Sequence, residues 1–341
     1  MNRSPKLKTI AIIRLSSLGD IVHTLPAFQL LRRRFPAARI SWFVEPGGAR
    51  LLRNFSGIDD IVVVDLKGRS LAGRIGSLRE LLRQHRGHFD LVLDFQGLIK
   101  SALLALLLGG ERLGFRRGNL REPLAACCYH RTAPLFSEQQ PVILKNIHLL
   151  SLLGIEGREV AYPLRPLQPS RQLTKLWTRL GRAAKGLVIL NVGGGWPTKR
   201  LSATQWLDVI AALGGEYPLL ILWGTPQERM VAERISRRSG VELAPELDFS
   251  DLIMLIRRAA LLVSGDTLAL HLADVVGTLS LGIFGPTAPE RNGSLLAGSA
   301  HLQRIMACSF CYRRTCDTMD CLRKLSVTEI VAAIRSVHAK Y

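Results

Sequence analysis

Asp20 is the first residue whose position suggests chemistry. It ends the short polar stretch Ser16–Asp20, which follows the apolar run Ile10–Ile13 and precedes a helical pattern. Gly19 frees the backbone at this turn, so a ligand can approach closely. A carboxylate there can accept a proton from a bound hydroxyl, but it can equally serve only as a helix N-cap, as can Ser17. The residues alone leave both functions open.

A glycine-rich loop with two cations is the second candidate. The stretch Asn191–Arg200 reads NVGGGWPTKR and contains Gly194, Gly195 and Lys199. Successive glycines let backbone N–H groups approach an anion, and the cations add positive charge. This pattern favours a phosphate-binding loop over a flexible turn with solvated cations. It matches neither the Walker loop nor the GxGxxG pattern, so a nicotinamide enzyme is not expected.

Acidic residues and a histidine follow the later strands. Glu228 comes after the stretch WGTPQ and can bind a ribose diol, or it can simply favour a helix N-terminus. Asp266 and Thr267 lie where the next helix should begin, and such an end attracts phosphate. His271 follows one turn later. Alone, a histidine in such a place is more often a core residue than a ligand.

Four of the six cysteines lie within fourteen residues of the C-terminal region. Their spacing allows a structural zinc site, although only the first pair has the usual short spacing. Free thiols and redox-dependent pairing are the alternatives, and stable disulfides do not suit a cytoplasmic protein. The adjacent pair at 127 and 128 resembles buried small hydrophobes. The four are Cys308, Cys311, Cys316 and Cys321.

The elements that must position these residues alternate between apolar runs and helical patterns. Such runs, apolar throughout, are typical of a parallel sheet buried on both faces. In open sheets of this kind, ligands bind beyond the carboxyl ends of the strands. The predicted strands are Thr9–Ile13, Ile40–Val44, Ile61–Val64, Leu91–Asp94, Leu187–Asn191, Leu219–Trp223, Leu261–Ser264 and Leu279–Phe284, with helices at Ala27–Arg34, Leu78–Gln84 and Thr204–Leu213.

The length of 341 residues suggests two domains of similar size. A stretch with three prolines, Tyr162–Ser170, indicates a linker, and the strand pattern restarts after it. We therefore expect an N-terminal domain at residues 1–165 and a C-terminal domain at residues 175–325. The remaining residues, 326–341, are expected to hold a closing amphipathic helix at Val327–His338.

The formal charge of +19, from 46 Lys and Arg against 27 Asp and Glu, indicates a polyanionic partner. Nucleic acid, an anionic membrane surface and a phosphorylated substrate all fit, and so does a basic proteome with solvated charges. Aromatic residues are only 6%, which disfavours nucleic acid. The longest apolar stretch, Ala102–Leu108, is too short to span a membrane, and no signal peptide is visible. We expect a cytoplasmic protein that rests on a membrane face.

Six stretches occur in the order found in the lipopolysaccharide heptosyltransferases. They are SSLGDIVHTLPA, DFQGLIKSAL, REPLA, WGTPQE, GDTLALHLA and FGPT, and they span most of the chain. The sequence thus resembles glycosyltransferase family 9, and the second, third and fourth stretches resemble the heptosyltransferase I group most. The resemblance implies the GT-B fold, in which two Rossmann-like parallel-sheet domains face a cleft, the first binding the acceptor and the second the nucleotide-sugar donor.

The resemblance also implies roles for individual residues. Asp20 corresponds to the general base of an inverting transfer of heptose from ADP-heptose to the Kdo region of lipid A. Lys199 would neutralise charge on the leaving diphosphate, and Glu228 would bind the adenosine ribose. Donor binding would further involve Gly194, Gly195, Asp266, Thr267 and His271, and acceptor binding would involve Ser17, Gly19 and Arg121. The family requires no metal cofactor, and the anionic inner leaflet gives the positive charge a rationale.

The chain departs from the family pattern at Leu268, where a glycine usually follows Asp-Thr. A side chain at this position can change which nucleotide sugar the enzyme accepts as donor. A family 9 transferase for another nucleotide sugar or acceptor is therefore the main alternative. A non-catalytic nucleotide-sugar binder is less expected, because it would tend to lose Asp20. A nucleic-acid binder is the least expected class.

Overall fold

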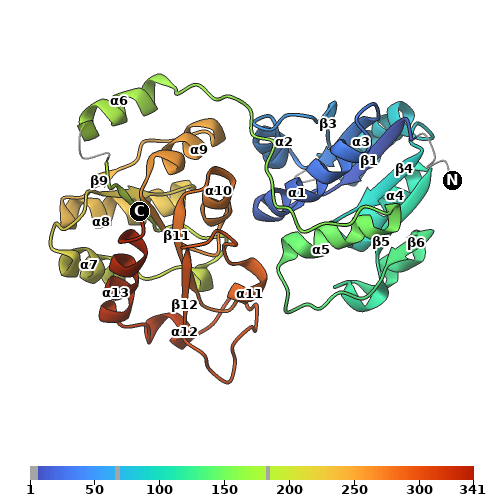
Figure 1. The fold of residues 1–341 in the computed structure, drawn as a ribbon. Coiled ribbons are helices and arrows are strands. Elements are labelled where there is room, and N and C mark those ends of the chain that lie inside the picture. Colours follow the sequence, from blue (N-terminus) through green and yellow to red (C-terminus); the bar gives the residue numbers. More distant parts are fainter. Residues whose placement is uncertain (1–6, 66–69, 182–184) are drawn as a thin grey trace. The chain divides into compact units, whose positions relative to one another are not determined.

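The computed structural model describes residues 7–65, 70–181 and 185–341. The chain divides into two compact units, Met1–Arg165 and Pro166–Tyr341. Each unit is one six-stranded sheet with helices on both faces (Figure 1). Every strand pair in both sheets is parallel, so the candidate loops of each unit gather at one edge of its sheet.

The first sheet has the strand order β3-β2-β1-β4-β5-β6. Its first four strands confirm the predicted positions, whereas the short, charged β5 and β6 were not predicted. The strands are β1 (Thr9–Ile13), β2 (Arg39–Val44), β3 (Asp60–Val63), β4 (Leu91–Asp94), β5 (Glu111–Phe115) and β6 (Arg131–Ala133). β1 lies in the middle, so the loop that carries Asp20 leaves the centre of the sheet.

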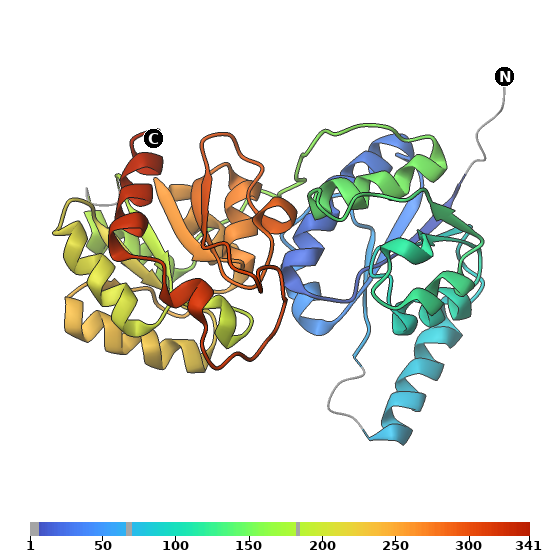
Figure 2. The ribbon, with the colours of Figure 1, turned by 90° about the horizontal axis from the view of Figure 1, so that it is seen from below.

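Helices α1 and α5 pack together in this unit, and α4 packs against the 3-10 helix η2. The observed α1 starts nine residues before the predicted Ala27–Arg34, because Pro26 is accommodated inside the helix. Figure 2 shows the same helices from below, with α3 in cyan. The helical elements are α1 (Leu18–Arg34), α2 (Pro46–Leu52), α3 (Leu71–His85), α4 (Ile99–Leu108), η1 (Arg117–Asn119), η2 (Pro123–Cys128), α5 (Val142–Leu149) and η3 (Leu150–Leu153).

The second sheet has the order β12-β11-β10-β7-β8-β9. Its strands are β7 (Val188–Asn191), β8 (Leu219–Leu222), β9 (Glu242–Leu243), β10 (Leu261–Gly265), β11 (Leu279–Phe284) and β12 (Ala300–Gln303). Its helices are α6 (Arg171–Leu180), η5 (Pro197–Lys199), α7 (Ala203–Leu213), α8 (Pro226–Ser239), α9 (Phe249–Arg258), α10 (Leu268–Val276), α11 (Pro289–Asn292), α12 (Asp320–Arg323) and α13 (Val327–His338).

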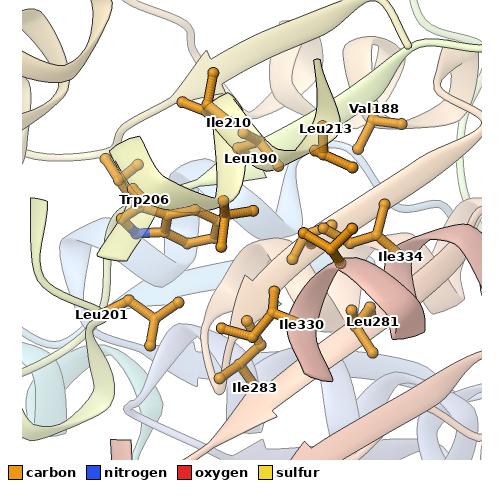
Figure 3. Close-up of a cluster of buried hydrophobic side chains, with 14 of the residues drawn as sticks. Val188, Leu190, Leu201, Trp206, Ile210, Leu213, Leu281, Ile283, Ile330 and Ile334 are labelled. Atoms are coloured by element: carbon orange, nitrogen blue, oxygen red, sulfur yellow. The ribbon is translucent and has the colours of Figure 1, made fainter. Parts of the chain in front are cut away.

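The C-terminal helix α13 belongs to the core of the second unit. It packs against α7 and β11, and Figure 3 shows Ile330 and Ile334 beside sheet residues such as Leu281. Trp206 of α7 lies in the same cluster and is 2% exposed. A capping box of Ser326 and Glu329 starts α13. This last helix therefore covers apolar surface of the sheet that would otherwise face water.

No helix in the described part of the chain is both long enough and apolar enough to cross a membrane.

Candidate active site

The first candidate residue, Asp20, lies in the first turn of α1. Ser17 is the N-cap residue and Asp20 stands three positions later, so the two form a capping box. The Asp20 atom Oδ2 accepts hydrogen bonds from the Ser17 backbone N–H at 3.2 Å and from its hydroxyl at 2.9 Å. The side chain of Asp20 remains 37% exposed. The carboxylate is therefore fixed by the helix start and still open to solvent.

Arg14, the last residue before this loop, pairs with the same carboxylate. Its guanidinium lies 2.8 Å from Asp20 Oδ1 and also donates to the carbonyl oxygen of Phe95. Burial raises the pKa of Asp20, but the charges of Arg14 and His23 and the hydrogen bonds from Ser17 outweigh it and lower that pKa to about 2. Asp20 is thus ionised throughout the physiological range, as a proton acceptor must be.

The loop after β4 supports the backbone next to Asp20. Gln96 Oε1 accepts hydrogen bonds from the backbone N–H groups of Leu15 and Ser16, at 3.0 and 3.1 Å. Asp94 Oδ1 in turn accepts from the Gln96 N–H at 2.8 Å, and Tyr129 donates its hydroxyl to Asp94 Oδ2 at 2.8 Å. Burial raises the pKa of Asp94, although these hydrogen bonds oppose it. Two neighbouring strands and the residue after η2 therefore contribute to the position of one loop.

The other predicted acceptor residues are less directly connected. Gly19 lies in the same helical turn as Asp20. Arg121 lies between η1 and η2, is exposed, and forms no hydrogen bond or ion pair with Asp20 or Ser17 in the part of the chain that the structure describes. Its neighbour Glu122 accepts a hydrogen bond from the Ile99 N–H at 2.7 Å. The structure brings Ser17, Gly19 and Asp20 together and leaves Arg121 apart.

In the second unit, Lys199, Asp266 and His271 form one buried cluster. Lys199 Nζ lies 2.6 Å from Asp266 Oδ2, and the two side chains are 10% and 5% exposed. His271 Nε2 lies 3.5 Å from Asp266 Oδ1. Burial raises the pKa of Asp266, but the hydrogen bond from His271 and the charge of Lys199 hold it well below its usual range. Lys199 is therefore paired with an ionised carboxylate.

Glu228 connects the two loops that follow β7 and β8. Its atom Oε1 accepts a hydrogen bond from the Gly194 N–H at 2.9 Å and pairs with Arg200 at 3.2 Å. Its atom Oε2 accepts from the N–H groups of Gly224 and Thr225, at 2.9 and 3.0 Å. Both oxygens are thus bound to protein donors, and the predicted contact of Glu228 with a ribose stays a prediction.

Two glycines explain how the loops approach each other so closely. A Cβ on Gly193 would lie 2.6 Å from Glu228 Oε2, and one on Gly265 would lie 2.5 Å from the carbonyl oxygen of Lys199. Real Cβ contacts are essentially never this short. Gly265 therefore requires glycine, because its neighbour is backbone, whereas a Cβ at Gly193 would displace the Glu228 carboxylate. Gly195, in contrast, has open space around it. The predicted phosphate-binding loop is therefore packed at one end and open at the other.

Thr267 is the N-cap residue of α10, and its hydroxyl belongs to a polar group beneath the helix start. Its Oγ1 accepts a hydrogen bond from Asn191 Nδ2 at 3.0 Å and lies 2.9 Å from Ser264 Oγ. Leu268 is half-buried at the first position of the helix. The positive end of the α10 dipole thus lies at the same sheet edge as Lys199.

Trp196 brings a second cation close to Lys199. Lys199 Nζ lies 4.0 Å from the centroid of the Trp196 ring, and Arg314 Cζ lies 5.1 Å from it. Both distances are in the range of cation–π interactions. Arg14, Gln96, Trp196 and Arg314 were not among the site residues predicted from the sequence. A sequence feature could have indicated two of them as site residues: Gln96 and Trp196 each lie in a polar or glycine-rich stretch after a strand.

The profile of glycosyltransferase family 9 (heptosyltransferase) matches residues 75–321, more than half of the chain. The protein belongs to glycosyltransferase family 9. The resemblance inferred from the six sequence stretches is thereby confirmed, and the chain is a glycosyltransferase of the heptosyltransferase family.

Individual relatives agree with the family. Lipopolysaccharide heptosyltransferase 1 of Pseudomonas aeruginosa is 29% identical over 320 residues, which cover 90% of this chain and 87% of the relative. The structure of E. coli heptosyltransferase WaaC with ADP has a TM-score of 0.75 at 22% identity and covers 96% of this chain and 99% of its own. A family 9 glycosyltransferase from Veillonella parvula has a TM-score of 0.78 at 19% identity, covering 98% of each chain. These similarities confirm the predicted GT-B fold.

The C-terminal cysteines are not grouped as a zinc site, one of the alternatives that their spacing allowed, would require. All four are free, and Cys308, Cys311 and Cys316 are exposed. Within residues 7–65, 70–181 and 185–341, no group of three or more His, Cys, Asp or Glu side chains is arranged to hold a metal ion. The expectation of burial for the adjacent cysteines is also wrong, because Cys127 is exposed and Cys128 only half-buried at the end of η2.

Proposed function

We propose that this family 9 enzyme transfers L-glycero-D-manno-heptose from ADP-heptose to the Kdo region of lipid A, with inversion at the anomeric carbon. The observation that carries the proposal is the ionised, partly exposed carboxylate of Asp20 at the carboxyl end of β1, held by Arg14 and Ser17. The names of the curated relatives, lipopolysaccharide heptosyltransferase 1, support the donor and the acceptor class.

In the proposed reaction, the oxygen of an acceptor hydroxyl forms a bond to the anomeric carbon from the face opposite the diphosphate. The bond between that carbon and the diphosphate oxygen breaks, and ADP leaves with the electron pair. The hydroxyl proton passes to Asp20. Because the pKa of Asp20 is about 2, the proton transfers only as the hydroxyl becomes acidic during bond formation. The base therefore acts late in the step and does not deprotonate the free acceptor.

The donor end of the reaction is assigned to the second unit. The ammonium group of Lys199 is paired with Asp266, with Nζ 2.6 Å from Oδ2. A bound diphosphate would compete with Asp266 for this ammonium group. This charge and the start of α10 would stabilise the negative charge that develops on the leaving group. The open end of the glycine loop, at Gly195, leaves room for phosphate oxygens close to the backbone. The solved complexes of E. coli WaaC with ADP and with an ADP-heptose analogue support this assignment.

We also propose that the enzyme binds the cytoplasmic face of the inner membrane, where a lipid acceptor resides. Helix α4 exposes the apolar side chains of Ile99, Leu103 and Leu106, each at least 40% exposed. Arg116 and Arg117, at the start of η1, are exposed, and η1 contacts η2, which packs against α4. An apolar helix face with cations in a neighbouring segment suits an anionic lipid surface. Arg121, which the family resemblance assigns to the acceptor, is in the next loop.

The test is ADP release from ADP-heptose and Kdo-lipid A by wild type, Asp20→Ala and Asp90→Asn. Asp90 is a matched control, because its carboxylate binds the Thr9 N–H at the opposite, amino-terminal end of β1. We expect Asp20→Ala to lose on the order of 10²-fold or more in kcat while its affinity for ADP is unchanged. Equal turnover by wild type and Asp20→Ala would show that Asp20 only caps helix α1 and does not act as the base.

The same assay with a panel of nucleotide sugars separates the main alternative. Leu268 at the start of α10 is the feature that favours another donor. Turnover of a different nucleotide sugar, with ADP-heptose inert, would keep the enzyme in family 9 and replace the donor proposed here.

A further inference from the structure

The segment that contains three of the four C-terminal cysteines packs on the loops of the candidate donor site. We call residues 304–319, between β12 and α12, the tail loop. Thr198, which is 3% exposed and precedes Lys199, donates its hydroxyl to the carbonyl oxygen of Arg313 at 2.7 Å. Tyr312 N–H donates to the carbonyl oxygen of Pro286 at 3.1 Å. The tail loop thus contacts both the loop after β7 and the loop after β11.

These contacts place Arg314 beside the indole ring that Lys199 also contacts. The guanidinium carbon of Arg314 lies 5.1 Å from the Trp196 ring centroid, and Lys199 Nζ lies 4.0 Å from it. Arg314 is exposed, and it has no ion-pair partner among the residues that the structure describes. Lys199 is already paired with a carboxylate, Asp266. An anion can bind Arg314, in contrast, without breaking an ion pair of the described residues.

We propose that Arg314 is a donor-binding residue, whose guanidinium binds the diphosphate of the nucleotide sugar together with Lys199. This inference rests on the proposed function, because it takes the surroundings of Lys199 as the donor site. Arginine suits the task, since its planar fork of N–H donors matches phosphate oxygens and forms charge-assisted hydrogen bonds. The donor site then includes a cation that the tail loop contributes from a position more than a hundred residues beyond Lys199.

A purely structural role for Arg314 makes a different prediction. If its contact with Trp196 only held the tail loop in place, its loss would disturb all ligands of the site alike. A phosphate contact affects ADP and leaves adenosine unchanged, because adenosine has no phosphate. Comparison of these two ligands therefore distinguishes binding of the diphosphate from support of the loop.

The experiment measures the Kd of ADP and of adenosine by calorimetry for wild type, Arg314→Ala, Arg314→Lys and Arg313→Ala. Arg313 is a matched control, because it contacts Thr198 through its backbone carbonyl and an alanine keeps that bond. For Arg314→Ala we expect the Kd of ADP to rise about tenfold, as for the loss of a charge-assisted hydrogen bond. The Kd of adenosine should change less than about twofold, and Arg314→Lys should lie in between.

Each result decides the inference. A selective loss of ADP affinity in Arg314→Ala, with Arg313→Ala like wild type, supports it. Equal losses for ADP and adenosine, or an unchanged ADP affinity in Arg314→Ala, overturn the inference alone and leave the proposed function standing. If wild type itself binds no ADP, the donor proposal fails and this inference fails with it.

Discussion

Arg14 offers the sharpest test of how the fold prepares Asp20. Replacement by methionine removes the guanidinium charge and keeps an unbranched side chain that can fill the same buried space. In the wild type, Arg14 is 7% exposed and its guanidinium lies 2.8 Å from Asp20 Oδ1. The substitution therefore removes the positive charge closest to the proposed base while Ser17 keeps its hydrogen bonds to Oδ2.

The expected change in the pKa of Asp20 follows from the balance between burial, which raises it, and the neighbouring charges and hydrogen bonds, which lower it. Burial raises the pKa of Asp20, and Arg14 is the strongest of the groups that lower it to about 2. Loss of a contacting opposite charge raises a carboxyl pKa by about 1–3 units, so the variant should titrate at roughly pH 3–5. Since the reaction needs the ionised form, activity is present above the pKa and is lost as the pH falls through it. Wild type should therefore show no loss from Asp20 above about pH 4.

The assay is kcat/KM for ADP release, measured from about pH 3.5 to pH 8.5. For Arg14→Met we expect an acid limb that wild type lacks, and for Arg14→Lys a profile close to wild type, because a cation is restored. Arg32→Met is the control, since it breaks a similar pair with Asp59 elsewhere in the first unit. The affinity for ADP should be the same in all variants, because the proposed donor residues lie in the second unit.

One outcome would refute this reasoning. If Arg14→Met lowers kcat/KM by the same factor at every pH, Arg14 supports the loop mechanically and does not set the ionisation of Asp20. A thermal melt of each variant identifies general destabilisation, which would lower activity without adding an acid limb.

Three further predictions concern other parts of the molecule. Asp266→Asn leaves the buried Lys199 without its carboxylate. The free energy of unfolding in urea should therefore fall by about 3–5 kcal/mol. Added ADP should raise the unfolding free energy of this variant more than that of wild type. Iodoacetamide should label Cys316 before Cys321, as followed by peptide mass spectrometry, because a hydrogen bond from the Met319 N–H lowers the pKa of exposed Cys316 whereas burial raises that of Cys321. Leu103→Asp should weaken sedimentation with anionic vesicles about fivefold or more, without changing the Kd of ADP. An unchanged unfolding free energy, equal labelling rates or undiminished vesicle binding would contradict these three expectations in turn.

Much of the fold followed from local patterns. The predicted strand Thr9–Ile13 matches β1 residue for residue, and Leu91–Asp94 matches β4, because a buried parallel strand is a short, fully apolar run that stands out in sequence. The strands β5 and β6 carry charged residues and are short, so no such run marked them. The polar loops after the apolar strands were also visible, since small and charged residues interrupt the pattern there.

The sequence by itself therefore determined the parallel strands and the polar loops that follow them at one edge of each sheet. Only the tertiary structure decided which side chains meet at that edge. Gln96 supports the backbone of Leu15 across 81 residues because β1 and β4 are neighbours in the sheet. Tyr129 reaches Asp94 across 35 residues because η2, which it follows, packs against β5, the neighbour of β4. Such contacts depend on strand order, and strand order is set by the packing of the whole sheet and its helices, which no local pattern contains.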